Sequence, residues 1–150
     1  ECNRLNLKSQ ILNEAEVIKN ETEIIIINSY GVIPNYLSIC KSVFIGKSLI
    51  KKLEAVGGQN PIEAAKFGCK IYHGPFVYNF KEIYNLLKKY NISEEINNED
   101  ELSKKLNKDL SNLDTINNAT IENINKLGNQ ILINTFNELE EVIKNENVKT

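Results

Sequence analysis

The hydrophobic and polar positions of the chain follow two periods, one typical of strands and one of helices. Short apolar runs predict strands at residues 23–28 (a buried one), 42–45 and 69–73, with a last short strand at residues 92–96. Between them, the spacing of apolar residues and the start and stop signals predict helices at residues 32–40, 60–67, 79–90 and 99–110. Because strands and helices alternate, we expect an α/β fold built on a parallel sheet.

The two ends of the chain add helical segments to this pattern. Residues 2–7 look like the end of a helix, and a long helix is expected from about residue 116 to residue 143, where apolar positions keep a helical spacing. The chain begins at Glu1 and contains no methionine, so we expect a fragment or a processed piece.

Composition limits the classes of protein to which the chain can belong. With 150 residues, 41% of them apolar, it is expected to be one domain, or part of a larger one, with a packed core. The net charge of −2 gives no field that would collect nucleic acid, so no such partner is expected. The longest purely apolar run, residues 24–27, is far shorter than the roughly 20 residues that span a bilayer.

The three cysteines, Cys2, Cys40 and Cys69, form an odd and widely spaced set, which is neither a disulfide framework nor a zinc site. Cys40 and Cys69 are expected to be small buried hydrophobic side chains, and a reducing cytoplasmic setting fits this interpretation. The sequence contains no cluster of metal-ligating residues, so we expect neither a metal nor a cofactor.

Ligands of parallel sheets bind at the carboxyl ends of the strands, which directs attention to residues 28–31, 46–60 and 73–79. An Asn-x-x-Glu spacing opens three predicted helices, at Asn60, Asn79 and Asn98. In this motif the Asn side chain accepts a free N–H of the first turn and the Glu reaches back to the cap. Helix capping is therefore the simplest interpretation of any one of the three.

The first of these helix starts differs because Gly57-Gly58 precedes it. Two glycines leave backbone amides uncovered by side chains, and such amides beside a helix start can receive a phosphate. Glu63, one turn inside the helix, could accept hydrogen bonds from two ribose hydroxyls. Capping and ribose binding are compatible because a carboxylate has about four acceptor sites, so both interpretations stay open.

Two further features sit at predicted strand ends. Gly46-Lys47-Ser48 looks like part of a phosphate loop, but the glycine that a Walker A motif requires four residues earlier is absent. His73, the only histidine, has no Cys or Asp at a triad-like spacing. We therefore expect a structural His73 rather than part of a nucleophilic site, although it faces the ligand edge.

Three motifs in this order, SVFIGKSL, GGQNPIEAAKFG and GPFVYNFKEIYNLL, resemble the C-terminal part of the 3-deoxy-D-manno-octulosonic acid (Kdo) transferases of lipid A assembly. The resemblance covers roughly residues 29–106. It implies a Rossmann-like parallel sheet flanked by helices, as the partial C-terminal half of a GT-B glycosyltransferase. Residues 1–114 would be the donor-nucleotide-binding domain, and residues 115–150 a long helix that packs back toward an N-terminal domain.

The resemblance also implies positions for ten residues around the donor. Glu63 would hold the ribose hydroxyls, with Asn60 beside it. The remaining residues would line the rest of the site: Gly46 and Ser48 at the phosphate or sugar, Gly57 and Gly58 in an open loop, Gly74, Pro75 and Asn79 on the opposite wall, and Gly31 near the base.

Four residues depart from the family pattern. Gln59 replaces a His, Lys47 a Gly and Phe76 a His, while Val32 stands where a Glu is usual. The carboxylate of Glu63 is retained, so the departures concern the contacts to the phosphate and to Kdo.

The activity implied by the resemblance is transfer of Kdo from CMP-Kdo to a lipid A precursor at the cytoplasmic face of the inner membrane. The acceptor site, the membrane association and the catalytic carboxylate would belong to the N-terminal domain, so no catalytic residue is expected here and this piece alone should be inactive. One alternative is another GT-B glycosyltransferase with a different nucleotide sugar. A second alternative is a non-catalytic Rossmann-like binding module.

Overall fold

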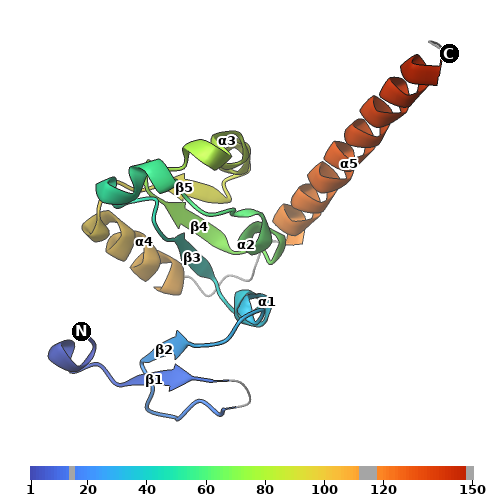
Figure 1. Cartoon of the computed structure of the whole chain (residues 1–150). Coiled ribbons are helices and arrows are strands. Elements are labelled where there is room, and N and C mark those ends of the chain that lie inside the picture. Colours follow the sequence, from blue (N-terminus) through green and yellow to red (C-terminus); the bar gives the residue numbers. More distant parts are fainter. Residues whose placement is uncertain (14–15, 112–117, 148–150) are drawn as a thin grey trace. The chain divides into compact units, whose positions relative to one another are not determined.

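The computed structural model describes residues 1–13, 16–111 and 118–147 (Figure 1). The chain separates into two compact units, Glu1–Tyr36 and Leu37–Thr150, and each is described by itself. The predicted domain boundary between residues 114 and 115 lies outside the described residues and stays a prediction.

The first unit contains a small parallel sheet. A 3-10 turn, Asn3–Leu5, precedes strand β1, Ser9–Leu12, which pairs with β2, Ile24–Ile27, and a short helix α1, Ile33–Leu37, follows. The residues 2–7 that look like a helix end thus form only a 3-10 turn. Strand β1 was not predicted, because its sequence, SQIL, combines two polar residues with two apolar ones and gives no clear period.

The prediction that residues 23–28 form a strand is confirmed, but the prediction that this strand is buried is wrong. Side chains of Ile25, Ile26 and Ile27 are 37%, 47% and 38% exposed. Among the described residues β2 pairs only with β1, and Leu12 is the one buried hydrophobic side chain of the unit. Pairing with β1 covers one edge of β2 and neither of its faces, and the side chains of a strand point to those faces, so the isoleucines of β2 keep contact with solvent.

The second unit is built on three parallel strands in the order β3–β4–β5, which confirms the predicted α/β fold with a parallel sheet. Its strands are β3, Ser42–Ile45; β4, Lys70–His73; and β5, Ser93–Glu95. Its helices are α2, Ile62–Lys66; α3, Lys81–Lys89; α4, Glu99–Ser111; and α5, Asn118–Asn147, with 3-10 turns η2, Lys51–Val56, and η3, Tyr78–Phe80. None of the helices in the described part of the chain is long and apolar enough to span a membrane.

Side chains alternate across β4 and so connect the two faces of the sheet to different helices. Ile71 and His73 point to the side covered by α3, where the His73 ring lies 4.2 Å from the Tyr84 ring. Tyr72 points to the other side, where its hydroxyl donates to Asp109 of α4 at 2.9 Å. Figure 1 shows α3 and α4 on opposite sides of the sheet, in agreement with this alternation.

The core lies under α2 and α3. It is a cluster of buried apolar side chains from the sheet and these helices, with Ile124 of α5 joining it at 8% exposure: Leu37, Ile45, Ala64, Ala65, Cys69, Ile71, Val77, Tyr84, Leu87, Ile92 and Ile124. Cys69 is buried as predicted, and burial raises the pKa of its thiol to about 11. Cys40 is only half-buried, which departs from the prediction.

Helix α4 is fixed to the sheet by one acidic side chain. Asp109 accepts hydrogen bonds from the hydroxyls of Ser42 and Tyr72, and the Lys41 ammonium donates to its backbone carbonyl at 3.1 Å. Burial and the hydrogen bond to Asp109 both raise the pKa of Tyr72, so the phenol stays protonated and keeps donating. This arrangement ties the last turns of α4 to the start of β3 and to β4.

Candidate functional site

The loops that follow β3 and β4 are joined at the carboxyl edge of the sheet through Ser48. The Ser48 hydroxyl donates to the Ile45 carbonyl at 2.6 Å and accepts from the Gly74 N–H at 2.9 Å, while its own carbonyl accepts from the Phe76 N–H at 2.9 Å. Ser48 is 0% exposed, and its only hydroxyl proton is already engaged. In this arrangement Ser48 positions the loops and has no proton to donate to a ligand.

Glycine is required where these loops touch. A Cβ on Gly74 would overlap the Ser48 carbonyl and lie 2.6 Å from the Leu49 nitrogen. Gly57 has φ +71°, and a Cβ there would lie 2.8 Å from Asn79 Cγ. Asn79 Nδ2 in turn donates to the Gly58 carbonyl at 3.0 Å. Gly57, Gly58 and Asn79 therefore meet in one place, and Gly74 lies against Ser48 and Leu49.

One expectation about this loop is wrong. The sequence suggests that the Gly57 amide is free, but it donates to the carbonyls of Leu53 and Glu54 at the end of η2. The Gly58 N–H makes no hydrogen bond within the described residues, although the residue is buried. The glycine pair thus offers at most one backbone donor rather than two.

The three Asn-x-x-Glu motifs are used in three different ways. At Asn98 a capping arrangement forms, because Asn98 Oδ1 accepts from the Glu101 N–H at 2.9 Å and Glu101 accepts from the Asn97 N–H at 3.0 Å. At Asn79 the amide instead holds the Gly58 carbonyl. Capping by both members of the motif is therefore confirmed at the third helix start alone.

At Asn60 the motif is only half used. Asn60 Oδ1 accepts from the Ile62 N–H at 3.0 Å, which satisfies one donor of the first turn of α2. The Glu63 carboxylate is exposed and makes no hydrogen bond or ion pair with any described residue. The residue does not close a capping box and does not point into the core, so its acceptor sites are open to a ligand.

The remaining predicted residues lie around these loops or in the other unit. Gly46 follows β3, and Lys47 after it has φ +67°, a left-handed conformation at a position where the family pattern has glycine. Pro75 is exposed just after Gly74. Gly31, with φ +76°, belongs to the first unit and its predicted place near a base stays a prediction.

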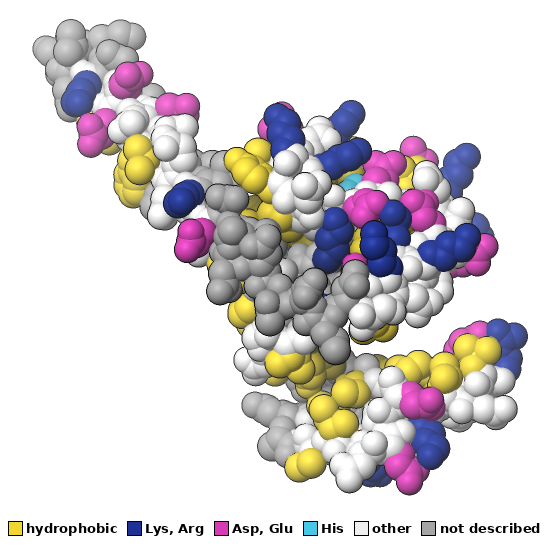
Figure 2. Space-filling view, turned by 180° about the vertical axis from the view of Figure 1, so that it is seen from behind, with side chains coloured by type: hydrophobic (Ala, Val, Ile, Leu, Met, Phe, Trp, Pro, Cys, Tyr) yellow, Lys and Arg dark blue, Asp and Glu magenta, His cyan; other side chains and the backbone are white. Residues whose placement is uncertain are grey.

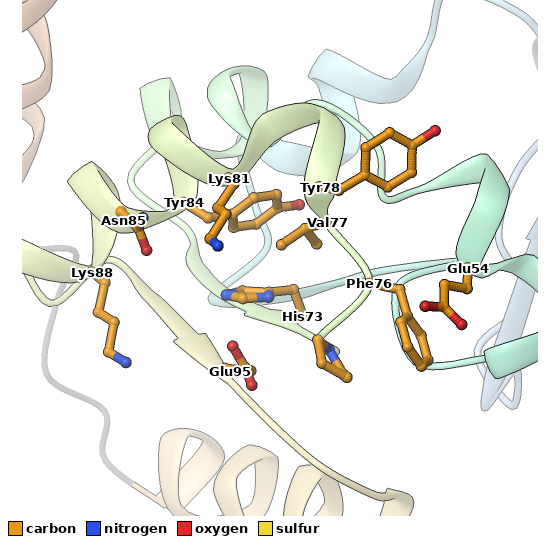
Figure 3. Close-up of a pocket in the computed structure, with 11 residues that line it drawn as sticks. Glu54, His73, Phe76, Val77, Tyr78, Lys81, Tyr84, Asn85, Lys88 and Glu95 are labelled. Atoms are coloured by element: carbon orange, nitrogen blue, oxygen red, sulfur yellow. The ribbon is translucent and has the colours of Figure 1, made fainter.

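The sequence did not predict a cavity of about 250 Å³ beside these loops (Figure 3). It lies at the ends of β4 and β5 and is lined by residues of η2, of the segment after β4, of α3 and of β5: Glu54, His73, Pro75, Phe76, Val77, Tyr78, Lys81, Tyr84, Asn85, Lys88 and Glu95. The only signal in the sequence is the spacing of Lys81, Asn85 and Lys88 on one side of α3, and this spacing is also typical of a solvated helix face.

His73 forms the inner wall of this cavity. It is 4% exposed, and burial lowers the pKa of its imidazole below the ordinary value. Its Nδ1 lies 2.7 Å from the Gly74 carbonyl, which can only accept, so Nδ1 carries the proton. Figure 2 shows the small exposed part of His73 beside Lys and acidic side chains.

The second unit is an α/β domain with a Rossmann-like parallel sheet, in which glycine loops at the strand ends lie near an exposed carboxylate at the start of a helix. Domains of this architecture bind their ligands at the carboxyl ends of the strands. Among the described residues, no group of three or more His, Cys, Asp or Glu side chains could hold a metal ion.

A comparison with solved structures gives a more particular likeness. The structure resembles the crystal structure of the C-terminal CMP-Kdo binding domain of WaaA from Acinetobacter baumannii, with a TM-score of 0.69 and 20% sequence identity. The match covers 82% of this chain and 63% of that chain, so the present chain spans less than two thirds of its neighbour. The likeness establishes the α/β fold. No protein-family model matches the sequence.

Proposed function

We propose that this chain is the CMP-Kdo-binding part of a GT-B glycosyltransferase that moves Kdo to a lipid A precursor. The observation that supports this most is the open carboxylate of Glu63 at the start of α2, in a fold similar to a CMP-Kdo binding domain. A motif that served only to cap the helix would be expected to use this carboxylate, as Glu101 is used at the start of α4.

In this proposal Glu63 accepts hydrogen bonds from the two ribose hydroxyls of the nucleotide. Asn60 uses Oδ1 for the helix, and its Nδ2 makes no hydrogen bond within the described residues, so the amide can donate to the nucleotide. Gly58 supplies a backbone N–H toward the phosphate, and Ser48 acts indirectly by holding Gly74. Gly46, Gly57, Pro75 and Asn79 shape the loops around the donor.

The reaction requires more than this chain supplies. Transfer of a sugar through an oxocarbenium-like transition state needs a base at the acceptor hydroxyl and stabilisation of the departing CMP phosphate. This chain contributes the second part, through the loop amide and the start of α2. The base, the lipid acceptor site and the association with the cytoplasmic face of the inner membrane belong in this proposal to a separate N-terminal domain, so the present piece binds donor without turnover.

A matched pair of variants tests the nucleotide site. Glu63→Ala is expected to weaken binding of CMP about tenfold or more, because a hydrogen bond to a charged group contributes roughly 1.5–3 kcal/mol. Glu101→Ala, at the same position in the capping motif of α4, is expected to leave CMP affinity unchanged and to lower the melting temperature. Titration calorimetry with CMP and thermal unfolding of both variants give the two measurements.

The outcomes separate the proposal from its alternatives. Unchanged CMP affinity in Glu63→Ala would contradict the role of this carboxylate. A preference for UDP or GDP over CMP would support another GT-B glycosyltransferase instead. The absence of binding to any nucleotide would support a non-catalytic binding module.

A further inference from the structure

The loop that leads into α2 is held by side chains of the segment that begins α3. Backbone carbonyls of this loop accept hydrogen bonds from side chains of residues 78–84: Ala55 from the Tyr78 hydroxyl at 2.8 Å, Gly58 from Asn79 Nδ2 at 3.0 Å, and Gln59 from the Tyr84 hydroxyl at 2.9 Å. The two segments also pack closely, because a Cβ on Gly58 would lie 2.8 Å from Cγ1 of Val77. Residues that are distant in the sequence therefore fix one loop.

The sequence of the loop explains why it needs this support. Glycine has more conformational freedom than any other residue, so the pair Gly57-Gly58 is ordered only at a cost in backbone entropy. Asn60 and Glu63, which the proposed function places at the nucleotide, follow shortly after this pair. A loop that is already held in one conformation binds a ligand more tightly than a loop that must first be ordered.

Tyr84 is the buried member of the set of side chains that hold the loop. It is 2% exposed, whereas Tyr78 is 63% exposed. The centre of its ring lies 4.2 Å from that of the His73 ring, and its backbone carbonyl accepts a hydrogen bond from the Ser93 hydroxyl at 3.0 Å. Both ends of Tyr84 are thus fixed to the sheet, so its hydroxyl is a rigid point from which the loop can be positioned.

The Tyr84 hydroxyl serves the loop and not the cavity beside it. Burial raises the pKa of the phenol, which therefore stays protonated and donates to the Gln59 carbonyl. Figure 3 shows this hydroxyl on the Val77 side of the ring, away from Lys88. Because the acceptor is a backbone carbonyl, the hydrogen bond fixes the chain next to Asn60 whatever side chain stands at position 59.

We propose that Tyr84 is a positioning residue of the nucleotide site. Its hydroxyl holds the Gln59 carbonyl and thereby fixes the start of α2 in the conformation that presents Asn60 and Glu63 to the nucleotide. This role rests on the proposed function, and it adds to the site a side chain of α3 that acts through the loop.

A second buried tyrosine supplies a matched control. Tyr72 is also 2% exposed, and its hydroxyl also donates a hydrogen bond at 2.9 Å, but to Asp109 on the other side of the sheet. Tyr72→Phe and Tyr84→Phe each remove one oxygen atom and one such hydrogen bond. Both variants should therefore lower the melting temperature, by about 2–8 °C. This measurement alone does not distinguish a positioning residue from a purely structural one.

Titration calorimetry of the 150-residue chain with CMP makes the distinction. Tyr84→Phe is expected to weaken CMP binding about fivefold, because ordering the released loop costs roughly as much as one hydrogen bond contributes. Tyr72→Phe, which lies away from the loop, should leave the affinity for CMP within about twofold of the parent. Equal affinities of the two variants for CMP would overturn the positioning role.

A double variant tests whether Tyr84 acts through the start of α2. If it positions Glu63, then Tyr84→Phe should weaken CMP binding less in a protein that already carries Glu63→Ala than in the parent. An undiminished effect of about fivefold in that background would show that Tyr84 acts by another route and would overturn the proposal.

Failure of this proposal differs from failure of the proposed function. If Glu63→Ala weakens CMP binding and Tyr84→Phe does not, the nucleotide site is retained and the role of Tyr84 is wrong. If the parent chain does not bind CMP, the proposed function is wrong and the role of Tyr84 is overturned with it.

Discussion

Single residues in this protein take their roles from contacts that the sequence does not reveal. His73 is an example, because a lone histidine before Gly-Pro predicts only a structural residue, whereas the structure places it in a cavity wall with a proton fixed on Nδ1. Glu63, Glu82 and Glu101 share one motif, and only the surrounding loops decide which of them closes a cap. The capping motifs could be recognised in the sequence, whereas the hydrogen-bond partners of their side chains depend on the tertiary structure.

The buried imidazole of His73 predicts a pH dependence of stability. Burial places its pKa in the folded protein below the ordinary value of 6.5, so the unfolded chain binds a proton that the folded chain does not. The free energy of unfolding should therefore fall as the pH decreases below 6.5, by at most about 1.4 kcal/mol per pH unit. Urea unfolding between pH 7 and pH 5 (about the range in which histidine titrates) should show a steeper decrease in the parent than in His73→Phe.

The pH range in which His73 changes the stability differs from that of the carboxylates. Hydrogen bonds from Asn13 and Asn97 lower the pKa values of Glu16 and Glu101 from 4.5, so the stability that they contribute is present above 4.5 and is lost only as the pH falls further. A parent and a His73→Phe variant with parallel pH profiles above this value would contradict a neutral buried ring.

The close contact between the loops that follow β3 and β4 predicts that alanine destabilises the protein at one glycine and is tolerated at another. Gly74→Ala places a Cβ against the backbone of Ser48 and Leu49, which cannot move without breaking the hydrogen bonds of Ser48, so we expect a loss of about 1–3 kcal/mol in the free energy of unfolding. Gly46→Ala meets no atom within 4 Å and should be tolerated. Denaturant unfolding of both variants measures the difference, and equal stabilities would show that the loops separate readily.

At the scale of elements, strands and helices of the second unit were largely predictable, because each combines a clear period with a stop signal. Gly68 ends α2 with φ +75°, as expected for a glycine after a helix. Strand β1 was missed and the exposure of β2 was not foreseen, since burial depends on how many strands and helices cover a segment. A run of four isoleucines predicts a strand without predicting what covers it.

The attachment of α4 predicts that a single acidic residue contributes strongly to stability. A carboxylate in the last turns of a helix is unfavourable because it lies at the negative end of the helix dipole. The hydrogen bonds that Asp109 accepts offset this cost. Asp109→Ala leaves the hydroxyl of Tyr72, a residue 2% exposed, without its partner. We expect a loss of about 1–3 kcal/mol in the free energy of unfolding.

Two companion variants identify the cause. Tyr72→Phe removes the donor while Asp109 keeps its bond from Ser42, so its loss should be smaller, about 0.5–1.5 kcal/mol. Lys104→Ala, on an exposed part of α4, should change stability very little. If Asp109→Ala were as stable as Lys104→Ala, packing alone would hold the helix to the sheet.

At the scale of the whole molecule, the two units differ in the amount of apolar surface that they bury. The second unit has a cluster that joins the sheet, α2, α3 and the start of α5, whereas Leu12 is the one buried hydrophobic side chain among the described residues of the first unit. Since burial of apolar surface is the main favourable term in folding, the stability of the isolated chain should be uneven.

Hydrogen exchange of the 150-residue chain tests this unevenness. The backbone amides of β1 and β2 are expected to exchange through local opening, at denaturant concentrations that leave β4 protected, because two short parallel strands with exposed isoleucines are marginally stable by themselves. A chain that starts at Leu37 should then keep the protection of β4 and the fluorescence and melting behaviour of the second unit. If β2 and β4 instead lost protection together in one transition, the first unit would be an integral part of the same cooperative fold, and its isoleucines would have to gain cover that the unit does not provide by itself.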